Sequence, residues 1–160
     1  MIRLTGVAAL IAVVAVGWMA LLPAPAVSQP LAFDHAKHRT TACDVCHRGA
    51  RGDARAGIPQ VALCQRCHAT APRGVSAQVW DEATRRGTLA WVAVTQMPLH
   101  VYFSHRRHTA IAGLDCVSCH GDFRDRTTPP PAAPVRLEMD TCMSCHRREG
   151  ASEDCTGCHR

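Results

Sequence analysis

The chain has few of the side chains that usually build a protein interior. Only 4% of its 160 residues are aromatic, and Leu, Ile and Phe are scarce beyond residue 30. The apolar fraction of 47% is inflated by alanines and by the N-terminal stretch. Because ordering a chain costs conformational entropy that apolar burial must offset, these side chains alone cannot hold a compact fold. Something other than side chains must therefore fill the interior.

Cysteine is absent outside a single repeated motif. All ten cysteines fall in five Cys-x-x-Cys-His units, which we number 1 to 5 along the chain. They are Cys43, Cys46 and His47 (unit 1); Cys64, Cys67 and His68 (unit 2); Cys116, Cys119 and His120 (unit 3); Cys142, Cys145 and His146 (unit 4); and Cys155, Cys158 and His159 (unit 5). This motif is typical of covalent haem c attachment, in which both thiols bond the porphyrin and the histidine ligates the iron. The sequence thus predicts five covalently bound haem c groups.

Disulfides, zinc and a thioredoxin-like site fit the motif less well than haem does. Disulfides would not require a histidine after every second cysteine. Zinc sites would combine Cys-x-x-Cys units in twos, and five is an odd number. A thioredoxin-like motif occurs once and beside a βαβ pattern, which is missing here.

Five histidines remain outside the units, one for each predicted haem. They are His35, His38, His100, His105 and His108. Ligation of every iron by two histidines is therefore possible, and such a six-coordinate iron has no open position for a substrate. Met139 and Met97 are reserve ligands. Loop proximity and the motif pattern assign His35 to unit 1, His105 to unit 3 and His108 to unit 5, with His38 and His100 serving units 2 and 4 in either order.

Two of these histidine pairs occur in a repeated Phe-x-His-x-x-His motif. The motif is "FDHAKH" from Phe33 to His38 and "FSHRRH" from Phe103 to His108. Residues three apart share one face of a helical turn, yet their rings can diverge toward two different haems. Each motif precedes further haem units, which indicates an internal duplication with one unit added.

The N-terminus carries one long apolar run. After Arg3, the 19 residues from Leu4 to Leu22 are uncharged. This length favours a retained membrane anchor over a signal peptide, although Ala24-Pro25-Ala26 resembles a cleavage site. Arg3 on the cytoplasmic side directs the rest outward. We expect a single N-terminal span in the cytoplasmic (inner) membrane, with the haem domain on the periplasmic side.

The expected fold is mostly irregular, with short α-helices wrapped around five haems, an N-terminal transmembrane helix and little or no β-sheet. The stretch "SAQVWDEATRRG" predicts a short helix that begins after Ser76 and ends at Gly87. The proline-rich segment from Thr127 to Pro134 predicts an extended loop. The expected domains are an anchor and linker (1–30) and a pentahaem domain (31–160), the latter comprising a two-haem half (31–74), a connector (75–98) and a three-haem half (99–160).

The basic character of the chain does not indicate nucleic acid as a partner. The formal net charge is +5. Five haems would bring about ten propionate charges, which nearly cancel the protein and iron charges together. The arginines are therefore expected to pair with propionates.

Several stretches resemble known multihaem cytochromes. The Phe-x-His-x-x-His and Cys-x-x-Cys-His pattern is similar to that of the cytochrome c7 and class III cytochrome c families. Four stretches resemble more closely the pentahaem subunit of alternative complex III, a quinol-oxidising membrane complex: "FDHAKH…CDVCH", "RAGIPQVALCQRCH", "WVAV…MP…VYFSHRRHTAIAGLDCVSCHG" and "LEMDTCMSCHR…DCTGCHR". That group tends to carry a histidine near Thr95, where this chain has none and has His100 instead.

The resemblance implies a role in electron transfer. It implies a non-enzymatic, membrane-anchored subunit of a respiratory complex that takes electrons from an iron–sulfur module and passes them to another cytochrome c or an oxidase. The expected partners are iron–sulfur and quinol-binding subunits, another cytochrome c, and the membrane through the N-terminal helix. Alternatives are a soluble periplasmic multihaem electron shuttle and a small anchored quinol dehydrogenase of the tetrahaem type. A multihaem reductase would need a five-coordinate haem, which five spare histidines argue against.

Overall fold

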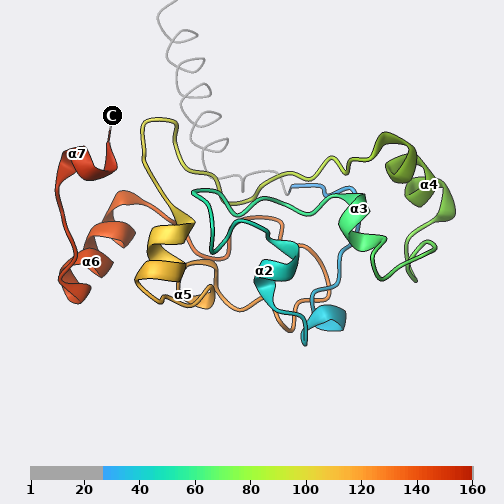
Figure 1. The fold of residues 1–160 in the computed structure, drawn as a ribbon, viewed down its shortest axis with the longest axis horizontal. Helices are drawn as coiled ribbons and strands as arrows, with labels where there is room; N and C mark the ends of the chain where they lie inside the picture. The colour runs from blue at the N-terminus through green and yellow to red at the C-terminus, as the bar shows by residue number, and fades with distance from the viewer. Residues whose placement is uncertain (1–26, 160) are drawn as a thin grey trace, which may run out of the picture.

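The computed structural model describes residues 27–159 as a mostly irregular chain with short helices (Figure 1). The elements in order are a 3-10 turn η1 (Ala36–His38), α2 (Cys43–Cys46), α3 (Val61–Cys64), α4 (Ala77–Arg86), a π-helical turn η2 (Arg107–Ile111), α5 (Val117–His120), α6 (Met139–Glu149) and α7 (Cys155–Cys158). Residues 27–159 contain no β-sheet, and an isolated bridge joins Val101 to His159. The prediction of short helices with little or no sheet is confirmed.

The helix predicted between Ser76 and Gly87 is present as α4. The Ser76 hydroxyl accepts a hydrogen bond from the Val79 N–H at 3.3 Å, which satisfies one of the free donors at the helix start. Gly87 ends the helix with a φ of 69°, a left-handed conformation that costs glycine little. The prediction from cap and terminator is therefore confirmed at both ends.

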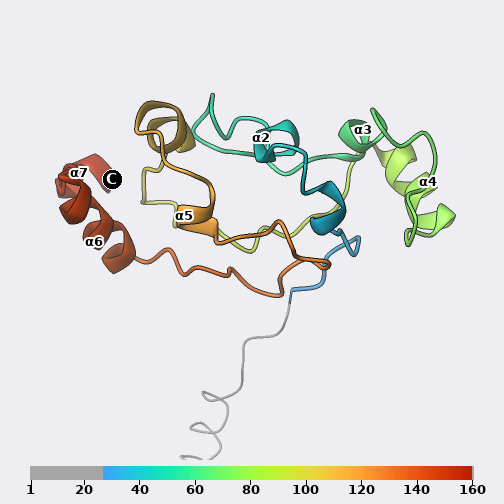
Figure 2. The ribbon, with the colours of Figure 1, turned by 90° about the horizontal axis from the view of Figure 1, so that it is seen from below.

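The helices follow one another along the long axis of the molecule in an order that differs from the sequence. From left to right in Figure 1 they are α7, α6, α5, α2, α3 and α4, and the view turned by 90° in Figure 2 keeps this order. Helices α6 and α7 thus lie at one end, and α3 with α4 lies at the other. The segment between α5 and α6 runs back toward η1, where the Arg126 carbonyl accepts a hydrogen bond from the Ala36 N–H. In this row α2 lies between α5 and α3.

The apolar core is small and lies at one end of the molecule. Among the described residues, the buried hydrophobic side chains are Ala50, Val61, Trp80, Ala83 and Leu89. The last four form one cluster where α3 packs against α4, and Leu31, Cys64 and Trp91 cover it in part. The other helices of residues 27–159 have no comparable cluster, so unit 2 alone lies beside an apolar core made of side chains.

The expected membrane-spanning helix and membrane location require correction. No helix of residues 27–159 is long and apolar enough to cross a bilayer, so these predictions are wrong for the part of the chain that the structure describes. The longest helix there, α6, has 11 residues. At its rise per residue it measures roughly 16 Å, about half the thickness of the hydrocarbon layer. The apolar run from Leu4 to Leu22 lies outside the described residues.

Candidate haem-binding sites

The five units share a tight backbone turn. In four of them the histidine N–H donates to the carbonyl of the first cysteine: His47 to Cys43 at 2.8 Å, His68 to Cys64 at 2.9 Å, His120 to Cys116 at 3.0 Å and His159 to Cys155 at 2.8 Å. Unit 4 lies wholly within helix α6. One helical turn thus brings the first cysteine and the histidine of each unit to the same side, as attachment to one porphyrin requires.

Four of the unit histidines lie opposite a histidine from elsewhere in the chain. The ring centroids are 6.1 Å apart for His38 and His68, 6.2 Å for His105 and His120, 6.3 Å for His108 and His146, and 5.5 Å for His100 and His159. For unit 1 the neighbour is His35. Burial lowers the pKa of His35, and the nearby His47 lowers it further. Each of the five spare histidines therefore lies near a different unit.

The spacing of the rings fits ligation of one iron by two imidazoles. Two rings that bind one metal through Nε2 from opposite sides, each at about 2 Å, have centroids about 6 Å apart. The four measured separations lie between 5.5 and 6.3 Å. The rings of each pair are therefore close enough for both to ligate one iron.

Hydrogen bonds at the other ring nitrogen support the same conclusion. In five histidines Nδ1 lies within hydrogen-bond distance of a backbone carbonyl: His38 with Asp34 at 2.9 Å, His47 with Gly57 at 3.1 Å, His105 with Ala54 at 3.0 Å, His108 with Ser104 at 2.8 Å and His146 with Ser152 at 2.6 Å. When a neutral ring donates from Nδ1 to the carbonyl, its Nε2 carries the lone pair that can bind a metal. Metal-binding histidines in proteins are commonly oriented in this way.

The two Phe-x-His-x-x-His motifs have nearly the same geometry. Phe33 stacks on His38, with centroids 4.8 Å apart and planes at 20°, and meets His35 edge-on at 4.8 Å. Phe103 stacks on His108 at 4.6 Å and 23°, and meets His105 edge-on at 4.9 Å. In each motif one phenyl ring thus sets the orientation of two imidazoles that point to different units.

The loop after unit 1 holds histidines of two units. The Ala54 carbonyl accepts from both the N–H and Nδ1 of His105, and the Asp53 carbonyl accepts from the Arg106 N–H at 2.9 Å. The Gly57 carbonyl holds His47. Gly49 permits the turn, because its φ is 93° and an added Cβ would lie 2.5 Å from the Arg55 carbonyl oxygen.

All ten cysteines are free thiols in the structure, and they approach one another between units. Burial raises the pKa of Cys46, Cys64, Cys116, Cys119 and Cys142, and a cysteine of another unit raises it further in each case: Cys67, Cys46, Cys43, Cys145 and Cys158, respectively. The attachment sites of different units are therefore close neighbours.

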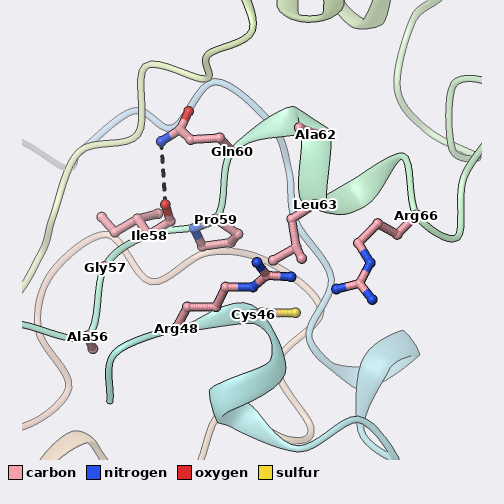
Figure 3. Close-up of a pocket in the computed structure, with 10 residues that line it drawn as sticks. All are labelled: Cys46, Arg48, Ala56, Gly57, Ile58, Pro59, Gln60, Ala62, Leu63 and Arg66. Atoms are coloured by element: carbon pink, nitrogen blue, oxygen red, sulfur yellow. Dashed lines mark hydrogen bonds between the residues drawn. The ribbon is translucent and has the colours of Figure 1, made fainter. Parts of the chain in front are cut away.

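An open hollow of about 320 Å³ lies between units 1 and 2. Its walls include Cys46, Ile58, Pro59 and Leu63 (Figure 3). The guanidinium groups of Arg48 and Arg66 face each other beside Cys46, and neither forms an ion pair within the described part of the chain. An anion between the two guanidinium groups would pair with both, and a haem propionate has the required charge.

The structure changes two of the ligand assignments suggested by the sequence. His108 lies beside unit 4 instead of unit 5, and His100 lies beside unit 5. In the structure His35 lies near unit 1, His38 near unit 2 and His105 near unit 3. The reserve ligand Met139 is 61% exposed at the start of α6.

Sequence reasoning missed the groups that orient the histidines. These are the carbonyls of Ala54, Gly57 and Ser152, and the ring of Phe123, which lies 5.2 Å from His35. A carbonyl is present at every residue and leaves no mark in the sequence. The glycines at positions 49 and 57, which both adopt a positive φ, are the sequence signal that could have indicated an ordered loop there.

Covalent attachment motifs with paired histidines define a multihaem c-type cytochrome, and comparison with protein families supports this class. Residues 101–160 match the family model described as "Cytochrome c7 and related cytochrome c", and residues 19–90 match the "Class III cytochrome C family". Each match covers less than half of the chain. No individual curated protein matches the sequence. The two matches support a multihaem cytochrome c, they imply covalent haem, and they indicate electron transfer.

Proposed function

We propose that the protein is a pentahaem electron carrier in which two histidines ligate every haem iron. The pairing of rings across the chain is the observation that carries this proposal. The proposed axial pairs are His47 with His35, His68 with His38, His120 with His105, His146 with His108, and His159 with His100.

Haem c bound in this way would supply one-electron chemistry between its ferric and ferrous states. The cysteine pairs fix each group covalently, and the backbone carbonyls keep the imidazoles in one orientation. With two histidines of the chain bound to it, the iron would offer no place for a substrate. Arg48 and Arg66 bind a propionate in the hollow between units 1 and 2.

The electron partners are one-electron carrier proteins, such as iron–sulfur proteins and other cytochromes. Neither matching family description names a membrane complex, which favours a carrier over a dedicated subunit. The four stretches that resemble the pentahaem subunit of alternative complex III support a narrower second proposal, in which the donor is an iron–sulfur, quinol-oxidising module.

Carbon monoxide distinguishes a carrier from an enzyme. Ferrous haem with two firmly held imidazoles does not bind carbon monoxide readily, whereas a five-coordinate catalytic haem does. The dithionite-reduced protein is expected to be low-spin throughout, with no absorbance change when carbon monoxide is added. A high-spin band in the reduced protein, or a carbon monoxide difference spectrum, would contradict the proposal.

Isolation from the native source tests the narrower proposal. A tagged form is purified under mild conditions and its companions are identified by mass spectrometry. Recovery of an iron–sulfur subunit in equal amounts supports a complex, and recovery of the cytochrome alone favours the carrier. A tagged variant with both unit 5 cysteines replaced by serine is the control for nonspecific capture.

A further inference from the structure

We propose that the five haem units lie in the spatial order 2–1–3–4–5, so that units 2 and 5 are the two ends where electrons enter and leave. This inference rests on the proposed function for its electron-transfer meaning. The order of the units follows from contacts within the chain and does not depend on which histidine ligates which iron. It differs from the order in the sequence, in which unit 1 would be at one end.

Units 1 and 2 are neighbours because one short segment serves both. His35 immediately precedes the η1 turn and His38 is its last residue. The His35 ring lies near His47 of unit 1, and the His38 ring lies near His68 of unit 2. The Phe33 ring contacts the imidazoles of both His35 and His38, and so fixes the position of one relative to the other. The hollow lined by Cys46 of unit 1 and Leu63 of α3 lies between the two units.

Unit 1 is also the neighbour of unit 3, which places it in the interior of the row. The loop after unit 1 binds the second Phe-x-His-x-x-His motif through the Ala54 carbonyl, which holds His105, the histidine beside unit 3. The Thr109 hydroxyl donates to the Ala50 carbonyl at 2.5 Å. Cys43 of unit 1 and Cys116 of unit 3 are within hydrogen-bonding reach. Unit 1 therefore separates unit 2 from unit 3.

Units 3, 4 and 5 continue the row in sequence order. His105 and His108 reach from one helical segment to units 3 and 4. Cys142 of unit 4 lies near Cys158 of unit 5. The segment before the second motif then reaches unit 5, because the Tyr102 N–H donates to the Cys158 carbonyl at 2.8 Å and His100 lies beside His159.

The ribbon agrees with these contacts. The helices that carry the units follow one another as α3, α2, α5, α6 and α7 in both views (Figures 1 and 2). One electron from a reduced carrier protein enters at one end unit, and one electron leaves to an oxidised carrier protein at the other. No bond is formed or broken. The small apolar cluster beside α4 therefore covers an end of the row, where a partner must approach.

Distances between labels in the intact haem protein test the order. Leu99 is 96% exposed next to His100, Thr40 is exposed just before unit 1, and Thr70 is exposed just after unit 2. Gd³⁺ labels are placed on Leu99→Cys combined with Thr40→Cys, and on Leu99→Cys combined with Thr70→Cys. In the haem-loaded protein the introduced cysteines are the free thiols. Pulsed dipolar spectroscopy is recorded on the reduced protein, whose low-spin ferrous haems are diamagnetic.

The expected result is a shorter distance from position 99 to position 40 than to position 70. A distance to position 40 that equals or exceeds the distance to position 70 would overturn the order. Because these variants keep every ligand and every attachment cysteine, a failure of the proposed function would appear separately, as fewer than five haems or a high-spin spectrum.

A second measurement uses two matched ligand variants. In the order 2–1–3–4–5, His35→Ala creates a high-spin iron at unit 1, which has two neighbours, whereas His38→Ala creates one at unit 2, which has a single neighbour. Electron paramagnetic resonance of the ferric protein should therefore show two perturbed low-spin signals for His35→Ala and one for His38→Ala. The reverse pattern would contradict the proposed order.

Discussion

The orientation of the His105 ring is set by other groups of the polypeptide, without any contribution from haem. One carbonyl, that of Ala54, accepts from both its N–H and its Nδ1, and Phe103 meets its ring edge-on. The ring can therefore direct only Nε2 toward the gap in front of His120. Holding the ligand in advance lowers the entropy lost when the iron binds.

Replacement of His105 by alanine tests this assignment. We expect one of the five haems to become high-spin and to bind carbon monoxide, while the haem content is unchanged, because the thioether bonds remain. Added imidazole should restore the low-spin spectrum. Arg107→Ala, two residues away and exposed, is the control. An unchanged spectrum in His105→Ala would remove this histidine from the ligands.

Arg48 and Arg66 are the residues with a predictable effect on redox potential. A cation near a haem favours the reduced state, which carries one less positive charge. Arg48→Gln and Arg66→Gln should therefore each lower the midpoint potential of a haem at unit 1 or 2, as measured by spectroelectrochemical titration. Arg73→Gln, an exposed arginine outside the hollow, should cause a smaller change. Equal shifts in all three variants would contradict a specific propionate contact.

At the scale of elements, the loop between units 1 and 2 matters as much as the helices. Its carbonyls hold the imidazoles of His47 and His105, and its shape depends on the left-handed conformation of Gly49. Gly52, three residues later, has no heavy atom within 4 Å of the position of an added Cβ. The two glycines therefore form a matched pair in one loop.

Gly49→Ala is expected to destabilise the protein by about 1–3 kcal/mol, because alanine is strained at this φ and its Cβ would clash with the Arg55 carbonyl. Gly52→Ala should be neutral or slightly stabilising, since alanine lowers the entropy of the unfolded chain. Denaturant unfolding followed by the haem absorption measures both. Equal stability of the two variants would show that the loop geometry is not required.

Local signals in the sequence predicted the helices and loops better than they predicted which spare histidine lies beside which haem unit. The Ser76 cap and the Gly87 terminator predicted α4, and the prolines near Thr127–Pro134 predicted an irregular segment. The partner of His100 could not be derived in this way, because His159 is far along the chain and their approach depends on how intervening loops close. The same limit explains why the sequence pattern assigns His108 to unit 5, although its ring lies beside His146.

At the scale of the whole molecule, we expect haem to take the place of an apolar core. The buried apolar side chains are few and gather beside α3 and α4 within the described residues. The units at the other end of the row have no such support there. The scarcity of apolar side chains in the sequence predicted so small a cluster. The order of the units along the row could be inferred only from the structure.

The polypeptide without haem is therefore expected to be largely unfolded. When it is produced in cells that lack haem attachment, circular dichroism should show little helix and heating should give no cooperative transition. Some residual structure around Val61 and Trp80 is compatible with this expectation. A cooperative transition equal to that of the haem-loaded protein would mean that the side chains suffice to fold the chain.

The mass of the denatured protein tests the central claim most directly. Haem held by thioether bonds survives denaturation, so the intact mass reports how many units carry it. The account predicts a single species whose mass exceeds that of its polypeptide by five haem groups. A mass that corresponds to four haems or fewer in fully matured protein would contradict it.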